Sequence, residues 1–196
     1  MNLAYFGLMP GYLGKGLGGA LLSRAIQRSI GDAMITAKDD PDCLDPFDLA
    51  RFVAAQAGSY AQALSEIGAG RKRSHWMWYV FPQVEGLGHS GVARRYSVKS
   101  REEARAYLEH PVLGRRLLEC AEAVVRVQGR TATEIFGFPD DLKLRSCATL
   151  FAAVAPESGV FKRILDKYYE GAPDERTLQI LETWRSREGR SDPETR

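Results

Sequence analysis

The sequence has few cysteines and no long apolar run. Its 196 residues include three cysteines, Cys43, Cys120 and Cys147, an odd number without a Cys-x-x-Cys pair. This count argues against a disulfide framework and against a cysteine zinc site, and it is typical of a reducing compartment. No stretch approaches the roughly 20 apolar residues that cross a bilayer, and the first residues lack the pattern of a secretory signal. We therefore expect a cytoplasmic protein with no membrane partner.

The chain also lacks a strong excess of charge of either sign. Its 27 Lys and Arg residues against 25 Asp and Glu give a formal net charge of +2. The net charge does not support nucleic-acid binding, so any anion must be bound by a local cluster of cations. The three histidines, His75, His89 and His110, lack the acidic or cysteine spacing of a metal site. We predict no metal and no cofactor.

What is abundant near the start is glycine. Residues 5–26 read YFGLMPGYLGKGLGGALLSRAI, a pattern of strand, Gly-rich turn and helix start that suits a phosphate. This segment resembles the acetyl-CoA-binding motif of GNAT acetyltransferases, Arg/Gln-x-x-Gly-x-Gly/Ala. The resemblance implies Gly14, Gly16 and Gly18 as cofactor-binding residues, although Leu13 stands at the first motif position.

That resemblance covers only about 30 residues, far less than an acetyltransferase domain needs. We interpret residues 1–31 as an acetyltransferase-motif-like remnant that forms a strand-loop-helix appendage. The polar, Pro- and Asp-containing residues 32–44 are interpreted as a linker. An acetyl-CoA-dependent N-acetyltransferase is therefore the least favoured of three functional hypotheses.

From Asp45 the apolar residues recur at helical spacing. Asp45 and Pro46 predict the N-cap and first residue of one helix that ends at Gly68 or Gly70. A capping box at Ser100 predicts the next helix after a loop-like segment. Further helices are expected over about 113–127, 133–137, 141–154, 158–170 and 174–184. We predict a mostly α domain over 45–184, a compact bundle of five or six helices, followed by a charged tail over 185–196.

Cations and aromatic rings are densest in residues 68–90, GAGRKRSHWMWYVFPQVEGLGHS. Such a mixture suits a planar anionic ligand, because rings offer stacking faces and cations neutralise phosphate. His75 is the candidate general acid or base. The candidate ligand-binding residues here are Arg71, Lys72, Ser74, Trp76, Trp78 and Gln83. The alternatives are that the tryptophans and Phe81 are core, that the basic residues form a solvated turn and that His75 is a structural histidine.

A second cation lies in the motif Lys143-Leu-Arg-Ser146. On a helix, Lys143 and Ser146 share a face, and we predict that both face the basic loop, with Lys72, His75 and Lys143 in one pocket. The alternative is that Lys143 pairs with Asp140. A Lys–Ser nucleophile is not favoured, because nothing in the sequence supplies an oxyanion hole or an orienting third group.

Several segments of the body together resemble one bacterial family of small helical proteins, domain-of-unknown-function family 1810. The similar segments are DLARFVAAQAGSYAQALSEIGAGRKRSHWMWYVFPQ, GLGHS, EARAYLEHPVLGRRLLEC, IFGFPDDLKLRSCATLF and LDKYYEGAPDERTLQIL. The resemblance runs from about residue 45 to 181 and implies an all-α fold and no established activity. Some members carry the label calpastatin, which this aromatic, cap-punctuated sequence does not support.

The leading hypothesis is binding, with or without turnover, of a small anionic, nucleotide-like ligand at the Lys/His/Trp site. The second is a non-enzymatic protein-interaction module in which the aromatic residues contact a partner. Convergence of the cations in a concave pocket favours the first, and a flat exposed aromatic patch favours the second. The sequence leaves the oligomeric state open.

Overall fold

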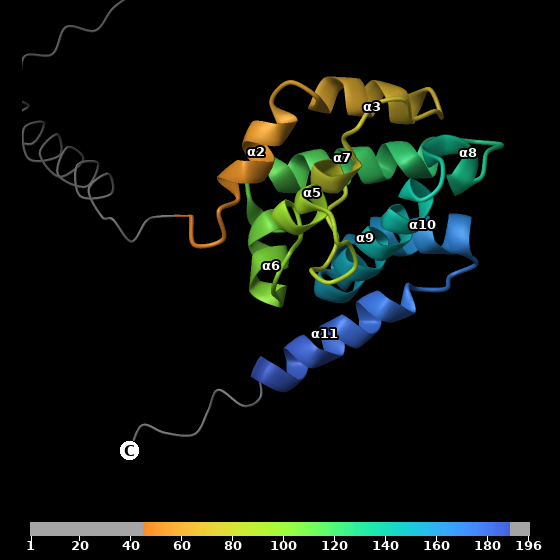
Figure 1. Cartoon of the computed structure of the whole chain (residues 1–196). Coiled ribbons are helices and arrows are strands. Elements are labelled where there is room, and N and C mark those ends of the chain that lie inside the picture. The colour runs from red at the N-terminus through yellow and green to blue at the C-terminus, as the bar shows by residue number, and fades with distance from the viewer. Residues whose placement is uncertain (1–44, 189–196) are drawn as a thin grey trace, which may run out of the picture. The chain divides into compact units, whose positions relative to one another are not determined.

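The computed structural model describes residues 45–188, and this part of the chain is helical (Figure 1). It contains ten α-helices, one 3₁₀-helix and, instead of a sheet, one isolated β-bridge between Val84 and Val98. The mostly α class is confirmed, whereas five or six helices is too few for the described residues. The Gly-rich segment with Gly14, Gly16 and Gly18, the linker and residues 189–196 lie outside the described residues.

The helices follow one another with short connections. In chain order they are α2 (Ala50–Gln56), α3 (Tyr60–Gly68), α4 (Met77–Val80), α5 (Gly91–Arg95), α6 (Arg101–Glu109), α7 (Leu113–Arg126), α8 (Ala132–Phe136), α9 (Asp140–Val154), η1 (Pro156–Ser158), α10 (Val160–Tyr169) and α11 (Glu175–Glu188). The segment predicted as a loop, 70–99, contains the short helices α4 and α5. Helix α11 continues to Glu188, beyond the predicted start of the tail at 185.

The prediction of one helix from Asp45 to Gly68 is wrong. Helix α2 begins only at Ala50, after Asp48 in a left-handed conformation (φ 49°), and the Asp45 carboxylate accepts a hydrogen bond from the Ala50 amide over 2.7 Å. The chain then turns at residues 57–59. Ser59, the N-cap of α3, has a non-helical φ of −124°, and α3 runs in a different direction from α2 (Figure 1). The apolar spacing continued across this turn, so periodicity alone did not reveal it.

The core forms between layers of helices. In Figure 1, α7 runs under α3, with α9 and α10 on its other side and α11 beyond α9. The pairs that pack directly against one another are α3 with α7, α7 with α10, α10 with α9, and α9 with α11. The predicted stripes of α7 and α9 are confirmed as core. Their buried residues include Leu117, Cys120, Val124, Leu144, Cys147, Leu150 and Phe151. Each large apolar side chain buried in this way stabilises the fold by about 1.5–3 kcal/mol.

Helix α9 has a special place in this arrangement. It packs against α6, α8, α10 and α11, and most of its residues from Leu144 to Phe151 are buried. Its first turn, which carries Asp140 and Lys143, is therefore anchored to the rigid centre of the domain. None of the helices within residues 45–188 combines the length and apolar character needed to cross a bilayer.

Candidate functional site

Two lysines from distant parts of the chain meet on one carboxylate. Lys72 Nζ lies 2.6 Å from Oδ2 of Asp140, and Lys143 Nζ lies 2.6 Å from Oδ1 of the same residue. The side chains are largely withdrawn from solvent, with exposed fractions of 8% for Lys72, 14% for Asp140 and 18% for Lys143. We call this group the lysine cluster. It brings together the two lysines expected to share a site, and it also contains the Lys143–Asp140 pair that was the alternative.

Each ammonium of the lysine cluster also lies over an indole ring. Lys143 Nζ is 4.2 Å from the ring centroid of Trp78, and Lys72 Nζ is 5.3 Å from that of Trp76. The Trp76 side chain is core, at 1% exposure, whereas Trp78 is half-buried and keeps part of its ring at the surface. Cation–π attraction fixes both lysine side chains in addition to the carboxylate.

The lysine cluster carries an excess positive charge. Burial acts to raise the pKa of Asp140, but hydrogen bonds from Lys143 and Lys72 outweigh it and hold that pKa below the ordinary value of 3.8. Asp140 is therefore ionised at neutral pH and balances one of the two lysines. The neighbouring Asp141 is engaged elsewhere, because its carboxylate accepts hydrogen bonds from the Thr133 hydroxyl over 2.6 Å and the Leu142 amide over 2.9 Å.

The loop that carries Lys72 is held by a buried glutamate in the last turn of α3. Oε2 of Glu66 accepts hydrogen bonds from the Arg73 amide, the Ser74 amide and Trp76 Nε1, at 2.8, 3.1 and 2.8 Å. Oε1 accepts from the Ser74 hydroxyl over 2.6 Å and from Gln62 over 3.0 Å. Burial raises the pKa of Glu66, yet these hydrogen bonds lower it to about 2, so the carboxylate stays charged and fixes the loop.

The same loop is tied to the far side of the site through its backbone. The Lys72 amide donates to the carbonyl of Ile135 in α8 over 2.7 Å. Helix α8 begins with a complete capping box between Thr131 and Glu134, and Asp141 at the start of α9 donates its amide to the Gly137 carbonyl over 3.0 Å. The loop, α8 and the first turn of α9 therefore form one connected scaffold around the lysine cluster.

The remaining predicted site residues fall into two groups. Arg71 and His75 are exposed on the loop. Among the described residues, the His75 imidazole makes no hydrogen bond or ion pair. The backbone carbonyl of His75 accepts a hydrogen bond from the Tyr79 hydroxyl over 3.2 Å. Ser146 is buried and donates its hydroxyl to the Leu142 carbonyl over 3.1 Å. Gln83 is half-buried, and its carbonyl accepts from the Val98 amide over 2.8 Å.

Sequence reasoning missed the role of Glu66, and it named Asp140 only as an alternative partner. A signal for Glu66 exists, since an acidic residue in the last turn of a helix opposes the helix dipole and calls for another partner.

The sequence prediction also missed an exposed apolar pair beside Asp140. Phe138 is 78% exposed and Leu142 is 48% exposed. Residues 45–188 hold no group of three or more His, Cys, Asp or Glu side chains arranged to bind a metal ion.

Comparison with known proteins gives a family and a solved structure. The family described as "Protein of unknown function (DUF1810)" matches residues 46–181. The crystal structure of the conserved hypothetical protein Rv1873 from Mycobacterium tuberculosis is similar, with 56% sequence identity and a TM-score of 0.70 over 70% of this chain and 99% of that one. No curated protein matches this chain. The chain belongs to the DUF1810 family of proteins of unknown function, as the match over most of its length shows.

Proposed function

We propose that this DUF1810 domain binds a small anionic, nucleotide-like ligand at the lysine cluster. The observation that supports the proposal is the convergence of Lys72 and Lys143 on a single carboxylate, Asp140, in a largely buried setting. Charges withdrawn from water are normally paired, and one carboxylate cannot balance two ammonium groups. An anionic ligand supplies the missing negative charge.

The chemistry of the surrounding side chains suits such a ligand. An ammonium group has three donors, so each lysine keeps donors for phosphate oxygens beyond its bond to Asp140. The partly exposed ring of Trp78 offers a stacking face for a base, and Arg71 and His75 stand exposed on the same loop. Gln83 is proposed as a further hydrogen-bonding group. Ser74, Trp76 and Ser146, in contrast, are proposed to act by holding the scaffold, because their polar atoms are bonded within the protein.

The direct test is a thermal-shift screen of the full chain against nucleotides, with AMP, ADP, ATP and NAD as the first probes. A ligand that binds only the folded protein raises its melting temperature. We expect at least one of these probes to do so for the wild type, and we expect Lys143→Ala and Trp78→Ala to remove the shift. Lys162→Ala is the matched control, since Lys162 is an exposed lysine paired with Asp166 on α10. No shift with any probe, or an equal shift with Lys143→Ala, contradicts the proposal.

Turnover is tested separately through His75. Chromatography of the bound nucleotide after incubation reports whether a product forms. If His75 is the acid or base, His75→Gln keeps the thermal shift and loses the product. Binding without a product in the wild type identifies a binding protein and not an enzyme.

A second function, protein interaction, is favoured by one specific observation. Phe138 and Leu142 are exposed to 78% and 48% at the start of α9, which is the position of the lysine cluster. Large apolar side chains exposed together are typical of contact surfaces. Under this second hypothesis, the full chain captures a partner protein, and replacement of both residues by serine removes that capture. The acetyltransferase hypothesis rests on residues 1–31, outside the described residues, and stays a prediction.

A further inference from the structure

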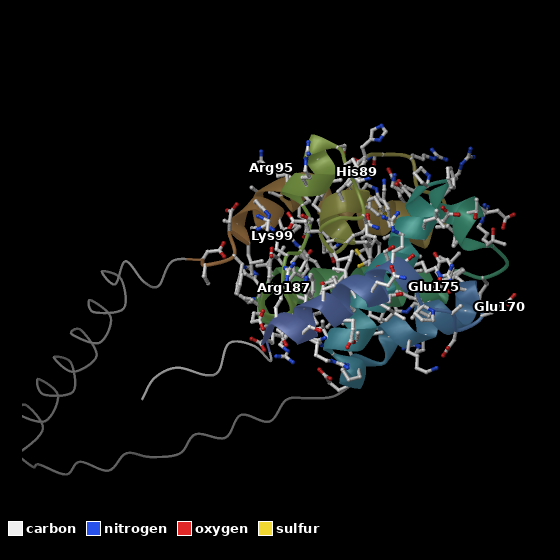
Figure 2. All side chains as sticks on the ribbon, turned by 60° about the horizontal axis from the view of Figure 1, so that its bottom comes forward. His89, Arg95, Lys99, Glu170, Glu175 and Arg187 are labelled. Atoms are coloured by element: carbon white, nitrogen blue, oxygen red, sulfur yellow. The ribbon has the colours of Figure 1, made fainter. Side chains whose placement is uncertain are left out.

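A polar cavity lies away from the lysine cluster, where the start of α2 meets α5 and α6. Its volume is about 470 Å³. The residues that line it are Pro46, Phe47, Asp48, Arg51, Arg94, Arg95, Lys99, Ser100 and Glu103. Figure 2 shows Arg95 and Lys99 on the same side of the domain, one below the other. None of these residues belongs to the lysine cluster, so the cavity is a separate feature.

The floor of the cavity is built around one buried arginine. The Arg51 side chain is 8% exposed and pairs with the carboxylate of Glu103. Its guanidinium also donates to the carbonyl oxygens of Phe47, Asp48 (2.8 Å), Arg95 (2.8 Å) and Ser97 (3.1 Å). A planar guanidinium with five donors can join several chain segments in this way. Arg51 therefore locks the start of α2 to the chain that follows α5.

Glu103 fixes the other rim of the same cavity. Its second carboxylate oxygen accepts from the Lys99 amide over 2.8 Å, and its own amide donates to the Ser100 hydroxyl over 3.1 Å. The backbone positions of Arg95 and Lys99 are thus both set by the Arg51–Glu103 pair. Side chains that project from such a fixed backbone are partly preorganised for a ligand, which lowers the entropic cost of binding.

The charges around this rim are unbalanced. Arg94, Arg95 and Lys99 are exposed, and none of them forms an ion pair with a carboxylate within residues 45–188. Glu103 is already paired with Arg51, which leaves Asp48 as the only other acidic residue in the lining. Three cations facing one carboxylate give the cavity a strong preference for anions.

We propose that this cavity binds the phosphate group of a small phosphorylated molecule. Phosphate suits it because the group carries up to two charges and several acceptor oxygens, which match the fork of an arginine. The volume lies in the range of small-molecule sites. Pro46 and Phe47 provide an apolar wall for the rest of the molecule. The site is independent of the proposed nucleotide site at the lysine cluster.

The test is isothermal titration calorimetry of the full chain with inorganic pyrophosphate as the probe. We expect the wild type to bind it, and we expect the triple variant Arg94→Ala/Arg95→Ala/Lys99→Ala to bind at least about tenfold more weakly, because hydrogen bonds between charged groups are lost. A matched control removes three exposed cations elsewhere, in Lys162→Ala/Arg163→Ala/Arg185→Ala. This control keeps the net charge of the triple variant and should bind like the wild type.

Two further results separate this proposal from the one for the lysine cluster. Lys72→Ala/Lys143→Ala should leave pyrophosphate binding at this cavity unchanged, while it abolishes the nucleotide-induced thermal shift. Circular dichroism of the triple variant checks that its helices are intact. Absence of binding by the wild type overturns the inference, and so does a triple variant that is folded and binds as tightly as the control.

Discussion

The indole nitrogen of Trp76 donates a hydrogen bond of 2.8 Å to the buried carboxylate of Glu66. The same carboxylate oxygen accepts the backbone amides of Arg73 and Ser74. A single side chain from the end of α3 thereby determines the path of the loop between α3 and α4. Because Lys72 is part of this loop, Glu66 also determines where one ammonium of the lysine cluster lies.

Replacement of Glu66 should therefore destabilise the domain strongly. We expect Glu66→Gln to lower the free energy of unfolding by about 2–4 kcal/mol, because several buried donors lose a charged acceptor. Urea denaturation followed by circular dichroism measures this change. Gln62→Ala is the control, since Gln62 is exposed and contributes only one hydrogen bond to the same carboxylate. Equal midpoints for the two variants would contradict the central role of Glu66.

The same carboxylate predicts how stability depends on acid. The pKa of Glu66 is lowered from 4.5 to about 2 in the folded protein, so between these pH values the unfolded chain binds more protons than the folded one. The Glu66 carboxylate contributes about 3 kcal/mol to the free energy of unfolding. This contribution is fully present above about pH 4.5 and is lost as the pH falls toward 2. Urea midpoints from pH 6 to pH 2.5 should fall steeply in the wild type and less steeply in Glu66→Gln. Parallel curves would show that other carboxylates govern acid unfolding.

Much of the fold follows from the sequence, whereas the partners of its buried charges do not. The spacing of Leu144 and Phe151 was enough to predict the inward face of α9, because helix periodicity is a local property. The capping box predicted Ser100 as the N-cap, and its hydroxyl does accept the Glu103 amide. The Glu103 carboxylate, however, binds the Lys99 amide and Arg51 instead of the Ser100 amide. Arg51 is 52 residues away, so no local rule could identify it.

The balance of charge at the lysine cluster gives a third prediction. Asp140→Asn keeps the shape of the side chain but leaves two ammonium groups without their shared anion. We expect a loss of about 1–4 kcal/mol in the free energy of unfolding at low salt. Lys72→Met removes one cation and keeps the apolar stem, so the double variant Lys72→Met/Asp140→Asn should recover part of this loss.

Thermal unfolding of the single and double variants in low and high salt measures this coupling. Sulfate should raise the melting temperature of Asp140→Asn more than that of the wild type, since it replaces the missing carboxylate. If the effects of the two substitutions simply add, Lys72 and Asp140 are not coupled, which contradicts the shared carboxylate at this site.

The last prediction concerns the crossing of α6 and α7. Gly114 lies in the first turn of α7, and a Cβ atom there would stand 1.8 Å from the carbonyl oxygen of Leu108 in α6. The clash is with backbone, so no side chain can move aside, and the two helices must separate. We expect Gly114→Ala to lower the free energy of unfolding by about 3 kcal/mol or more.

Gly68→Ala is the matched control, because nothing lies within 4 Å of its Cβ position in α3. The better helix propensity of alanine should raise the free energy of unfolding of this variant by about 0.5–1 kcal/mol. Urea midpoints that move in opposite directions for these two substitutions support the close crossing, and a Gly114→Ala variant as stable as the wild type would show that the helices do not approach each other in this way.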